Sequence, residues 1–266
     1  MRLLSYKIKA ICEDPGTNEI IVATKSGDIL ELGQSNPTRL LSKGHLGILT
    51  GLDKVGNKEE IATVARDKDL IIWDMNKMKE KKVIPLEFEG CQVACSPDGS
   101  HIAVGFVNGY VEVIEANNST IIKKMKDRNV KITLMKYSSS TDNVYLAVGA
   151  EDNELIVYKV KENYKIVSKV KGLKQFPIAV DFSEDGKILQ LVDNSFTLRY
   201  IDTVSGSKRP GFIFEHKDEK WSGWSSPIGW TVSGLFKNKA DIEEITTMSL
   251  SPERKILAVG LINGDI

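Results

Sequence analysis

The residues that could do chemistry are few and lie far apart along the chain. A histidine paired with a carboxylate is the arrangement that a general base requires, so His45 and Asp67 form one candidate catalytic pair. The sequence contains no H-E-x-x-H, G-x-S-x-G, Walker or G-x-G-x-x-G motif that would support such a reading. The histidines are His45, His101 and His216, and the cysteines are Cys12, Cys91 and Cys95.

Cysteine usage gives no sign of a metal site. Cys91 and Cys95 flank a short strand-like run on the same face, which is typical of buried apolar residues rather than metal ligands. Three cysteines are too few and too scattered for a disulfide framework in a chain of 266 residues. We therefore expect no enzyme activity, no metal and no cofactor.

Charge and hydropathy narrow the possible partners. The 36 basic and 36 acidic side chains give a formal net charge of zero, so nothing draws the whole chain toward nucleic acid or an acidic membrane. No apolar run reaches the roughly 20 residues of a membrane span, and the N-terminus lacks the apolar core of a signal peptide. The sequence predicts an intracellular protein with no nucleic-acid and no membrane partner.

The elements that would position these residues come from an internal repeat with a period in the forties. Its best copies share the pattern Ala-Val-Gly followed by a turn and a second β-rich run, as in strand–turn–strand hairpins. A turn-prone segment and a strand-like run precede each hairpin, and a further strand is expected after most of them. Three copies show the pattern most clearly, at residues 103–109, 147–153 and 258–264.

Four short antiparallel strands in about 42 residues correspond to one blade of a β-propeller. Helical repeats would need a 3.6-residue apolar rhythm, which is absent. We predict an all-β propeller of about six blades, the last one incomplete, forming one domain over residues 1–266 or part of one. The expected blades are residues 1–43, 44–87, 88–127, 128–172, 173–243 with an insertion at 203–243, and 244–266.

The second blade resembles the WD-repeat family, whose blades run from a Gly-His pair to a Trp-Asp pair. Gly44 and His45 begin this blade, and Trp73 and Asp74 end it. The resemblance implies a structural tetrad in which Trp73 bonds Thr63, Thr63 bonds His45, and His45 bonds Asp67. That structural role is favoured over the catalytic pair. The other blades lack the Gly-His pair and carry Tyr158, Ile114 or Ile201 near the tryptophan position, so their signatures are weaker.

Three longer stretches are similar to the echinoderm-microtubule-associated-protein-like family, and in particular to its second propeller. These are residues 8–32, residues 127–158, and the tryptophan-bearing segment 218–242, which interrupts the same blade junction in that family. The resemblance covers nearly the whole chain, from Ile8 to Ile266. It implies a microtubule-associated protein of the cytoskeleton, cilium or axoneme that binds tubulin. It also implies a tandem propeller. Because the repeat stops at Ile266 in the third strand of the sixth blade, we expect this chain to be a fragment, or its ring to be completed by strands or a propeller from elsewhere.

The insertion holds Trp221, Trp224 and Trp230, without the alternating pattern of a blade strand. One alternative is that these rings pack the insertion onto its own propeller. The other is a partner-binding loop, because tryptophan is enriched at interface hot spots. Lysines on two predicted outer strands offer a similar choice between solvated edges and contact with an acidic surface such as that of tubulin. The candidate partner-binding lysines are Lys79, Lys81, Lys82, Lys123 and Lys124.

The leading interpretation is a non-catalytic WD-repeat scaffold that binds protein partners, with microtubules and axonemal proteins as the partners implied by the resemblance. One alternative is a generic cytosolic WD-repeat adaptor without a microtubule role. A second is a propeller hydrolase, which would require carboxylates or histidines gathered at the mouth of the central channel.

Overall fold

The computed structural model describes residues 8–13, 20–24, 28–32, 39–42, 44–140, 144–209, 216, 218–229, 232, 245–251 and 253–263. Within these residues the chain forms six antiparallel sheets in sequence order, joined by turns and one short 3-10 turn, η1 (Val160–Glu162). The all-β propeller predicted from the repeat is confirmed. No described helix is long and apolar enough to cross a membrane.

Four of the sheets contain four strands each. The first has β1 (Ile8–Glu13), β2 (Ile20–Thr24), β3 (Ile29–Leu32) and β4 (Arg39–Ser42). The second has β5 (Leu49–Lys54), β6 (Glu60–Ala65), β7 (Asp69–Asp74) and β8 (Lys79–Pro85). The third has β9 (Gly90–Cys95), β10 (His101–Phe106), β11 (Val111–Glu115) and β12 (Ile121–Met125). The fourth has β13 (Ile132–Tyr137), β14 (Tyr145–Ala150), β15 (Glu154–Lys159) and β16 (Lys165–Val170).

The last two sheets show fewer strands in the described residues. The fifth has β17 (Pro177–Phe182), β18 (Ile188–Asp193) and β19 (Leu198–Asp202), and Lys208 forms an isolated bridge with Ile201. The sixth has β20 (Ile245–Leu250) and β21 (Leu257–Leu261). The first strand of each sheet is called its inner strand here.

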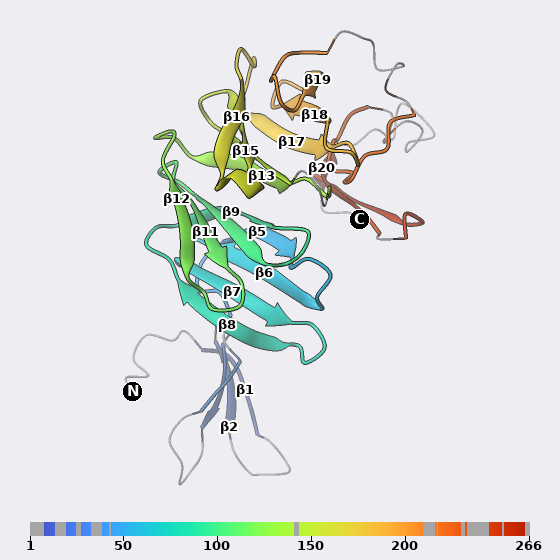
Figure 1. The fold of residues 1–266 in the computed structure, drawn as a ribbon. Coiled ribbons are helices and arrows are strands. Elements are labelled where there is room, and N and C mark those ends of the chain that lie inside the picture. Colours follow the sequence, from blue (N-terminus) through green and yellow to red (C-terminus); the bar gives the residue numbers. More distant parts are fainter. Residues whose placement is uncertain are drawn as a thin grey trace.

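Sheets two to five stack face to face, and the apolar core lies between them (Figure 1). Because side chains alternate across a strand, neighbouring residues enter opposite layers. Ala103 packs against the fourth sheet, for example, whereas Val104 packs against the second. Each fully buried side chain such as Phe106 or Phe182 contributes about 1.5–3 kcal/mol of burial free energy.

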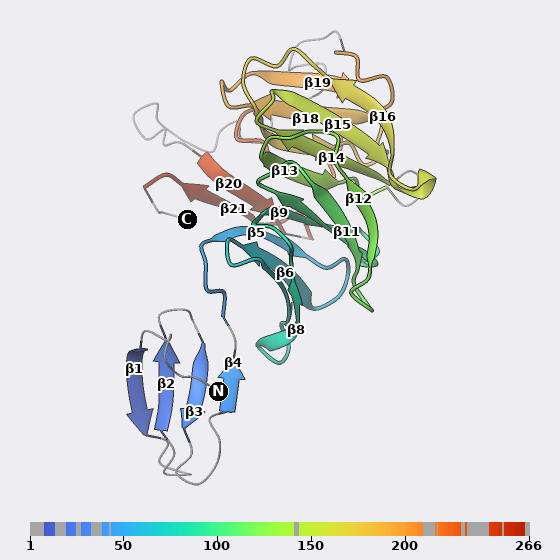
Figure 2. The ribbon, with the colours of Figure 1, turned by 90° about the vertical axis from the view of Figure 1, so that its left-hand side faces the viewer.

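The first sheet departs from the expected radial stack. Both ribbon views show β1–β4 standing away from the other sheets, joined to them by the chain that follows β4 (Figures 1 and 2). As a result the face of the second sheet next to it carries exposed Ile48, Leu49 and Leu52, at 66%, 50% and 58%. The inner strands β9 and β13 have no comparable exposure, because a sheet covers each of their faces.

Every inner strand contains a β-bulge near its start. In the second to sixth sheets the bulged residues are Thr50, Cys91, Thr133, Ile178 and Thr246. A bulge re-aims the side chain of the extra residue. Three of these side chains use this to bond the next sheet: the Thr50 hydroxyl donates to the Gly90 carbonyl at 2.8 Å, the Cys91 thiol to Ile132 at 3.2 Å, and the Thr133 hydroxyl to Pro177 at 2.8 Å.

Candidate interaction site

The hydrogen-bonded chain in the second sheet has the partners that the WD-repeat resemblance implies. The Trp73 indole donates to Thr63 Oγ1 at 2.7 Å, Thr63 Oγ1 lies 2.8 Å from His45 Nε2, and His45 Nδ1 lies 2.9 Å from Asp67 Oδ2. Asp67 also accepts the backbone N–H of Leu46 at 2.6 Å. Burial acts to raise the pKa of Asp67, but the hydrogen bond from His45 and those from backbone N–H groups outweigh it and lower the pKa. Both imidazole nitrogens therefore have partners within the sheet.

The fourth sheet has a different network at the corresponding place. Tyr158 takes the position of Trp73, and its hydroxyl donates to Asp127 at 2.8 Å. Burial, followed by the Asp127 carboxylate, raises the pKa of Tyr158. Arg128 next to it bonds Asp152 at 2.9 Å. In the fourth sheet, a tyrosine–carboxylate hydrogen bond thus takes the place that the Trp–Thr–His–Asp chain has in the second sheet.

Cys91 and Cys95 are both buried, at 4% and 7% exposure, as predicted. Burial raises the pKa of the Cys91 thiol to about 12, so the thiolate is absent at neutral pH. Cys12, Cys91 and Cys95 are free thiols. In the described ranges, no group of three or more His, Cys, Asp or Glu side chains is arranged to hold a metal ion.

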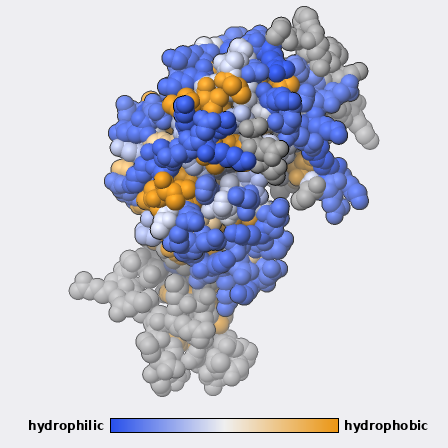
Figure 3. Space-filling model, viewed as in Figure 1, coloured by the Kyte–Doolittle hydropathy of each residue, from blue (hydrophilic) through white to orange (hydrophobic). Residues whose placement is uncertain are grey.

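The candidate lysines lie on the outer strands β8 and β12, and most have partners. Lys81 pairs with Glu60, Lys82 donates to the Asn117 carbonyl at 3.0 Å, and Lys124 pairs with Glu112 at 2.7 Å. Lys79 and Lys123 make no hydrogen bond or ion pair within the described part of the chain. Figure 3 shows this face as largely hydrophilic, with small apolar areas. Three of the five candidate lysines are therefore already bonded, and Lys79 and Lys123 are the two without a partner among the described residues.

The insertion returns to the inner edge of the fifth sheet. Trp221 bridges Ser183 at the end of β17, and its ring is 4% exposed and stacks on Tyr200 with centroids 5.9 Å apart. In this structure Trp221 packs the insertion onto its own propeller, which was the first of the two alternatives. Trp224 is half-buried against the same cluster. Trp230 lies outside the described residues.

A buried carboxylate fixes the insertion. Asp181 on β17 is fully buried, and it accepts the N–H groups of Ser225 at 2.8 Å and Ser226 at 3.1 Å together with the Ser225 hydroxyl at 2.9 Å. A β-carbon added to Gly223 would lie 2.8 Å from Asp181 Oδ1, so only glycine lets the chain approach this closely. Burial raises the pKa of Asp181, and Lys136 acts in the opposite direction.

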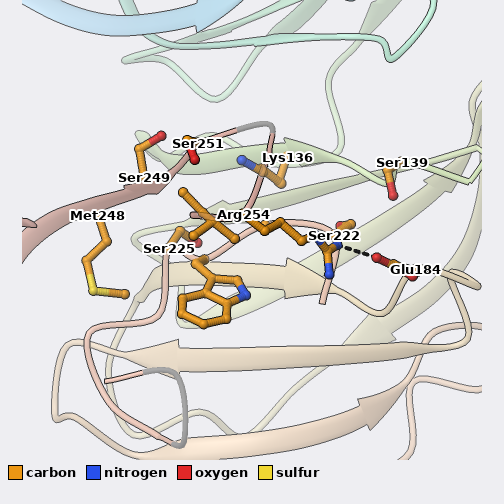
Figure 4. Close-up of a pocket in the computed structure, with 12 residues that line it drawn as sticks. Lys136, Ser139, Glu184, Ser222, Ser225, Met248, Ser249, Ser251 and Arg254 are labelled. Carbon is orange, nitrogen blue, oxygen red and sulfur yellow. Dashed lines mark hydrogen bonds and ion pairs between the residues drawn. The ribbon is translucent and has the colours of Figure 1, made fainter. Parts of the chain in front are cut away.

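Beside this contact a cavity of about 520 Å³ opens between the inner strands. Lys136 from β13, Ser222 and Trp224 from the insertion, and Ser249 and Arg254 from the sixth sheet line it (Figure 4). The dashed ion pair in Figure 4 joins Arg254 to Glu184, and Arg254 also donates to the Trp221 carbonyl at 3.0 Å. A second cavity, of about 250 Å³, has Lys136, Ser139 and Ser222 in common with the lining of the first.

Sequence reasoning did not single out Lys136 or Arg254. A signal was present, because Lys136 occupies the next-to-last position of its inner strand, where Asp53, Asp181 and Ser249 stand in other sheets. The repeat places these polar residues at equivalent positions, but only the structure shows that Lys136 lies near the carboxylates of Asp53 and Asp181.

Comparison with known proteins identifies the family. The family model described as "Echinoderm microtubule-associated protein second beta-propeller" matches residues 49–266. The chain belongs to this family. It is 25% identical over 255 residues to echinoderm microtubule-associated protein-like 3 of Homo sapiens, covering 95% of this chain and 28% of that protein. It is 27% identical over 255 residues to echinoderm microtubule-associated protein-like 4 of Xenopus laevis, covering 95% and 27%.

A sea-urchin relative extends this picture. The chain is 26% identical over 262 residues to the 77 kDa echinoderm microtubule-associated protein of Lytechinus variegatus, covering 95% of this chain and 38% of that protein. The chain thus spans well under half the length of these three relatives. The family resemblance seen in the sequence is confirmed, and the family match covers sheets two to six.

Proposed function

We propose that this chain is a non-catalytic propeller that acts as a protein-interaction scaffold and associates with microtubules in the cytoskeleton. The observation that carries the proposal is the family match over residues 49–266, whose members are named as microtubule-associated. The proposed domain is a single propeller, or part of one, with the blade limits expected from the repeat. Rigid stacked sheets suit this role because they hold loops and rims in fixed positions.

The hydrogen bonding supports a non-catalytic role. A histidine bonded to a carboxylate and to a hydroxyl group is also the arrangement of a nucleophilic triad, so the access of substrate to the hydroxyl separates the two roles. Thr63 is 4% exposed, and its hydroxyl oxygen bonds His45 and already accepts the indole N–H of Trp73. We infer that this tetrad stabilises the second sheet and has no catalytic part.

Sedimentation with polymerised tubulin tests the microtubule role. We expect saturable co-pelleting at low salt that weakens as salt screens the contact. Replacing the unpaired lysines with glutamine, as in the double variant Lys79→Gln/Lys123→Gln, should weaken pelleting about threefold, because exposed charge pairs contribute about 0.2–1 kcal/mol each.

The matched control is Lys187→Gln/Lys255→Gln, which removes the same charge from turns of the fifth and sixth sheets. Equal weakening by both double variants would show a contact that depends only on net charge. No pelleting even at low salt would contradict the proposal and leave the generic WD-repeat adaptor as the better description.

A further inference from the structure

Strand β12 forms the open outer edge of the third sheet. The strand order in that sheet is β12-β11-β10-β9, and no described strand pairs with the other side of β12. Both ribbon views show β12 at the margin of the stacked sheets (Figures 1 and 2). An edge strand presents a row of unpaired N–H and C=O groups, which another extended chain can bond in series. The backbone of β12 therefore suits a strand from a partner.

The side chains of β12 leave this edge less protected than its neighbours. Outer strands commonly carry charges or proline, which discourage pairing with another chain. β8 has three lysines and ends at Pro85, and the apolar side chains of β16 are buried or half-buried. β12 instead begins with Ile121 and Ile122, which are 47% and 41% exposed. Covering these two side chains with a partner would remove apolar surface from water.

A groove beside this edge continues the apolar surface. Its volume is about 330 Å³, and residues of β8, β11 and β12 line it. The buried side chains of Ile84, Leu86 and Ile114 form part of its wall, and Ile121 lies at the same groove. Ser119, between β11 and β12, also lines it, and the buried Ser119 hydroxyl has no hydrogen-bond partner among the described residues. An incoming chain can bury an apolar side chain here and bond this hydroxyl.

The charge in the middle of β12 distinguishes between two occupants of the edge. Lys123 makes no ion pair with a described residue, and its cross-strand neighbour on β11 is the apolar Val113. Full antiparallel pairing with the β12 of a second copy would place Lys123 opposite Lys123, and like charges directly opposite each other are destabilising. A carboxylate in that position would instead form a cross-strand ion pair. The charge thus favours a partner strand with an acidic side chain over a second copy.

We propose that the edge of β12 binds an extended segment of a partner protein in antiparallel pairing. The segment carries an acidic side chain opposite Lys123 and apolar side chains next to Ile121 and Ile122. The backbone hydrogen bonds supply affinity, and the side chains of the added strand supply specificity. This inference rests on the proposed role as a protein-interaction scaffold, but it does not require microtubules.

The test is an NMR titration of the full chain with the peptide acetyl-Thr-Thr-Glu-Val-Val-Thr-amide, whose glutamate and valines match the proposed positions. We expect shifts at the amides of β12. Two further versions carry backbone N-methyl groups, one on the second and fourth residues and one on the third and fifth. Alternate residues of a strand bond the same neighbour, so one version should bind about tenfold more weakly and the other as the parent peptide does.

The double variant Ile121→Thr/Ile122→Thr should bind the parent peptide about fivefold more weakly, because threonine keeps the strand preference but removes apolar surface. The matched control, Ile256→Thr/Ile262→Thr, changes two exposed isoleucines that flank β21 and should bind as the wild type does. A peptide with lysine in place of glutamate should bind the wild type about threefold more weakly. The comparison of peptides on the wild-type chain stays valid if a variant unfolds.

Equal binding of the two methylated versions would overturn the proposal, as would shifts confined to residues outside β12 or the absence of any shift. Shifts at β12 that grow with the concentration of the chain alone would assign the edge to a second copy and would also overturn it. Co-pelleting with microtubules is read separately. Its loss with peptide binding intact contradicts only the microtubule role, and the reverse result contradicts only the edge site.

Discussion

Two glycines that end the same Ala-Val-Gly motif meet different surroundings. A β-carbon built on Gly149 in the fourth sheet would lie 2.9 Å from the ring of Pro177 in the next sheet. In the sixth sheet, the nearest atom to the same position on Gly260 is a methyl group of Thr247, an exposed residue of its own sheet. The glycine of this motif thus lies where the inner strand of the next sheet packs. This close contact is present at Gly149, where two sheets stack, and absent at Gly260.

The bulged residues show the same contrast. Thr133 donates from the fourth sheet to Pro177 of the fifth, whereas Thr246 donates to Gly260 in its own sheet. The bulged residue of the fifth sheet is Ile178, whose side chain has no hydrogen-bond donor. In that sheet the insertion bonds β17 and the residue that follows it instead. Contacts between stacked sheets therefore repeat, while the junction after the fifth sheet is built from the insertion.

The largest effect is expected from filling the space at a stacked junction. Gly149→Val should destabilise the chain by about 1–3 kcal/mol, because the added methyl groups collide with the Pro177 ring in a packed core. Gly260→Val should cost less than about 0.5 kcal/mol, since the exposed Thr247 side chain can rotate away. Urea denaturation followed by circular dichroism measures both. Similar losses in the two variants would remove the distinction between stacked and unstacked sheets.

A smaller effect is expected from removing one bond between sheets. Thr133→Val should cost about 1 kcal/mol, because the Pro177 carbonyl loses its donor in a partly buried place. Thr246→Val removes a hydrogen bond that is exposed to solvent, so its cost should stay within about 0.5 kcal/mol. The same denaturation experiment compares them. A cost for Thr246→Val equal to that for Thr133→Val would show that the bond to the next sheet adds nothing.

The sequence predicted the strands well because turn residues and alternation are local signals. The predicted copies of the repeat that start at Ala103, Ala147 and Ala258 fall on β10, β14 and β21. The sequence also showed which blade contains the Trp73 hydrogen-bond chain, because the four residues of this chain have the spacing of a known motif.

Contacts between distant segments were not readable in this way. The position of Lys136 within its strand was readable, but its surroundings were not, since Asp53 and Asp181 come from two other sheets. The burial of Trp221 depends likewise on the return of the insertion to Ser183 and Tyr200. The exposure of Leu49 and Leu52 depends on the separate position of the first sheet.

The subtlest test concerns two aspartates of the fifth sheet with opposite shifts. Burial raises the pKa of Asp181 under the insertion above its ordinary value of 3.8, so the native state holds this proton to higher pH than the unfolded chain does. Its contribution to stability therefore falls as pH rises through that raised pKa. Hydrogen bonds from Ser183 and the N–H of Lys187 lower the pKa of Asp185 to about 2, so its contribution is lost as pH falls from 3.8 toward 2.

Relative to Asp181→Asn, the wild type should gain stability as pH is lowered from neutral toward 3.8. Relative to Asp185→Asn, it should lose stability below 3.8. Urea denaturation at a series of pH values measures both differences, and the Asp185 effect should be small because half of that side chain is exposed to solvent. If the wild type lost stability on acidification relative to both variants, the insertion would not shield Asp181 from water. The proposed difference between the covered edge of β17 and the exposed turn that follows it would then be wrong.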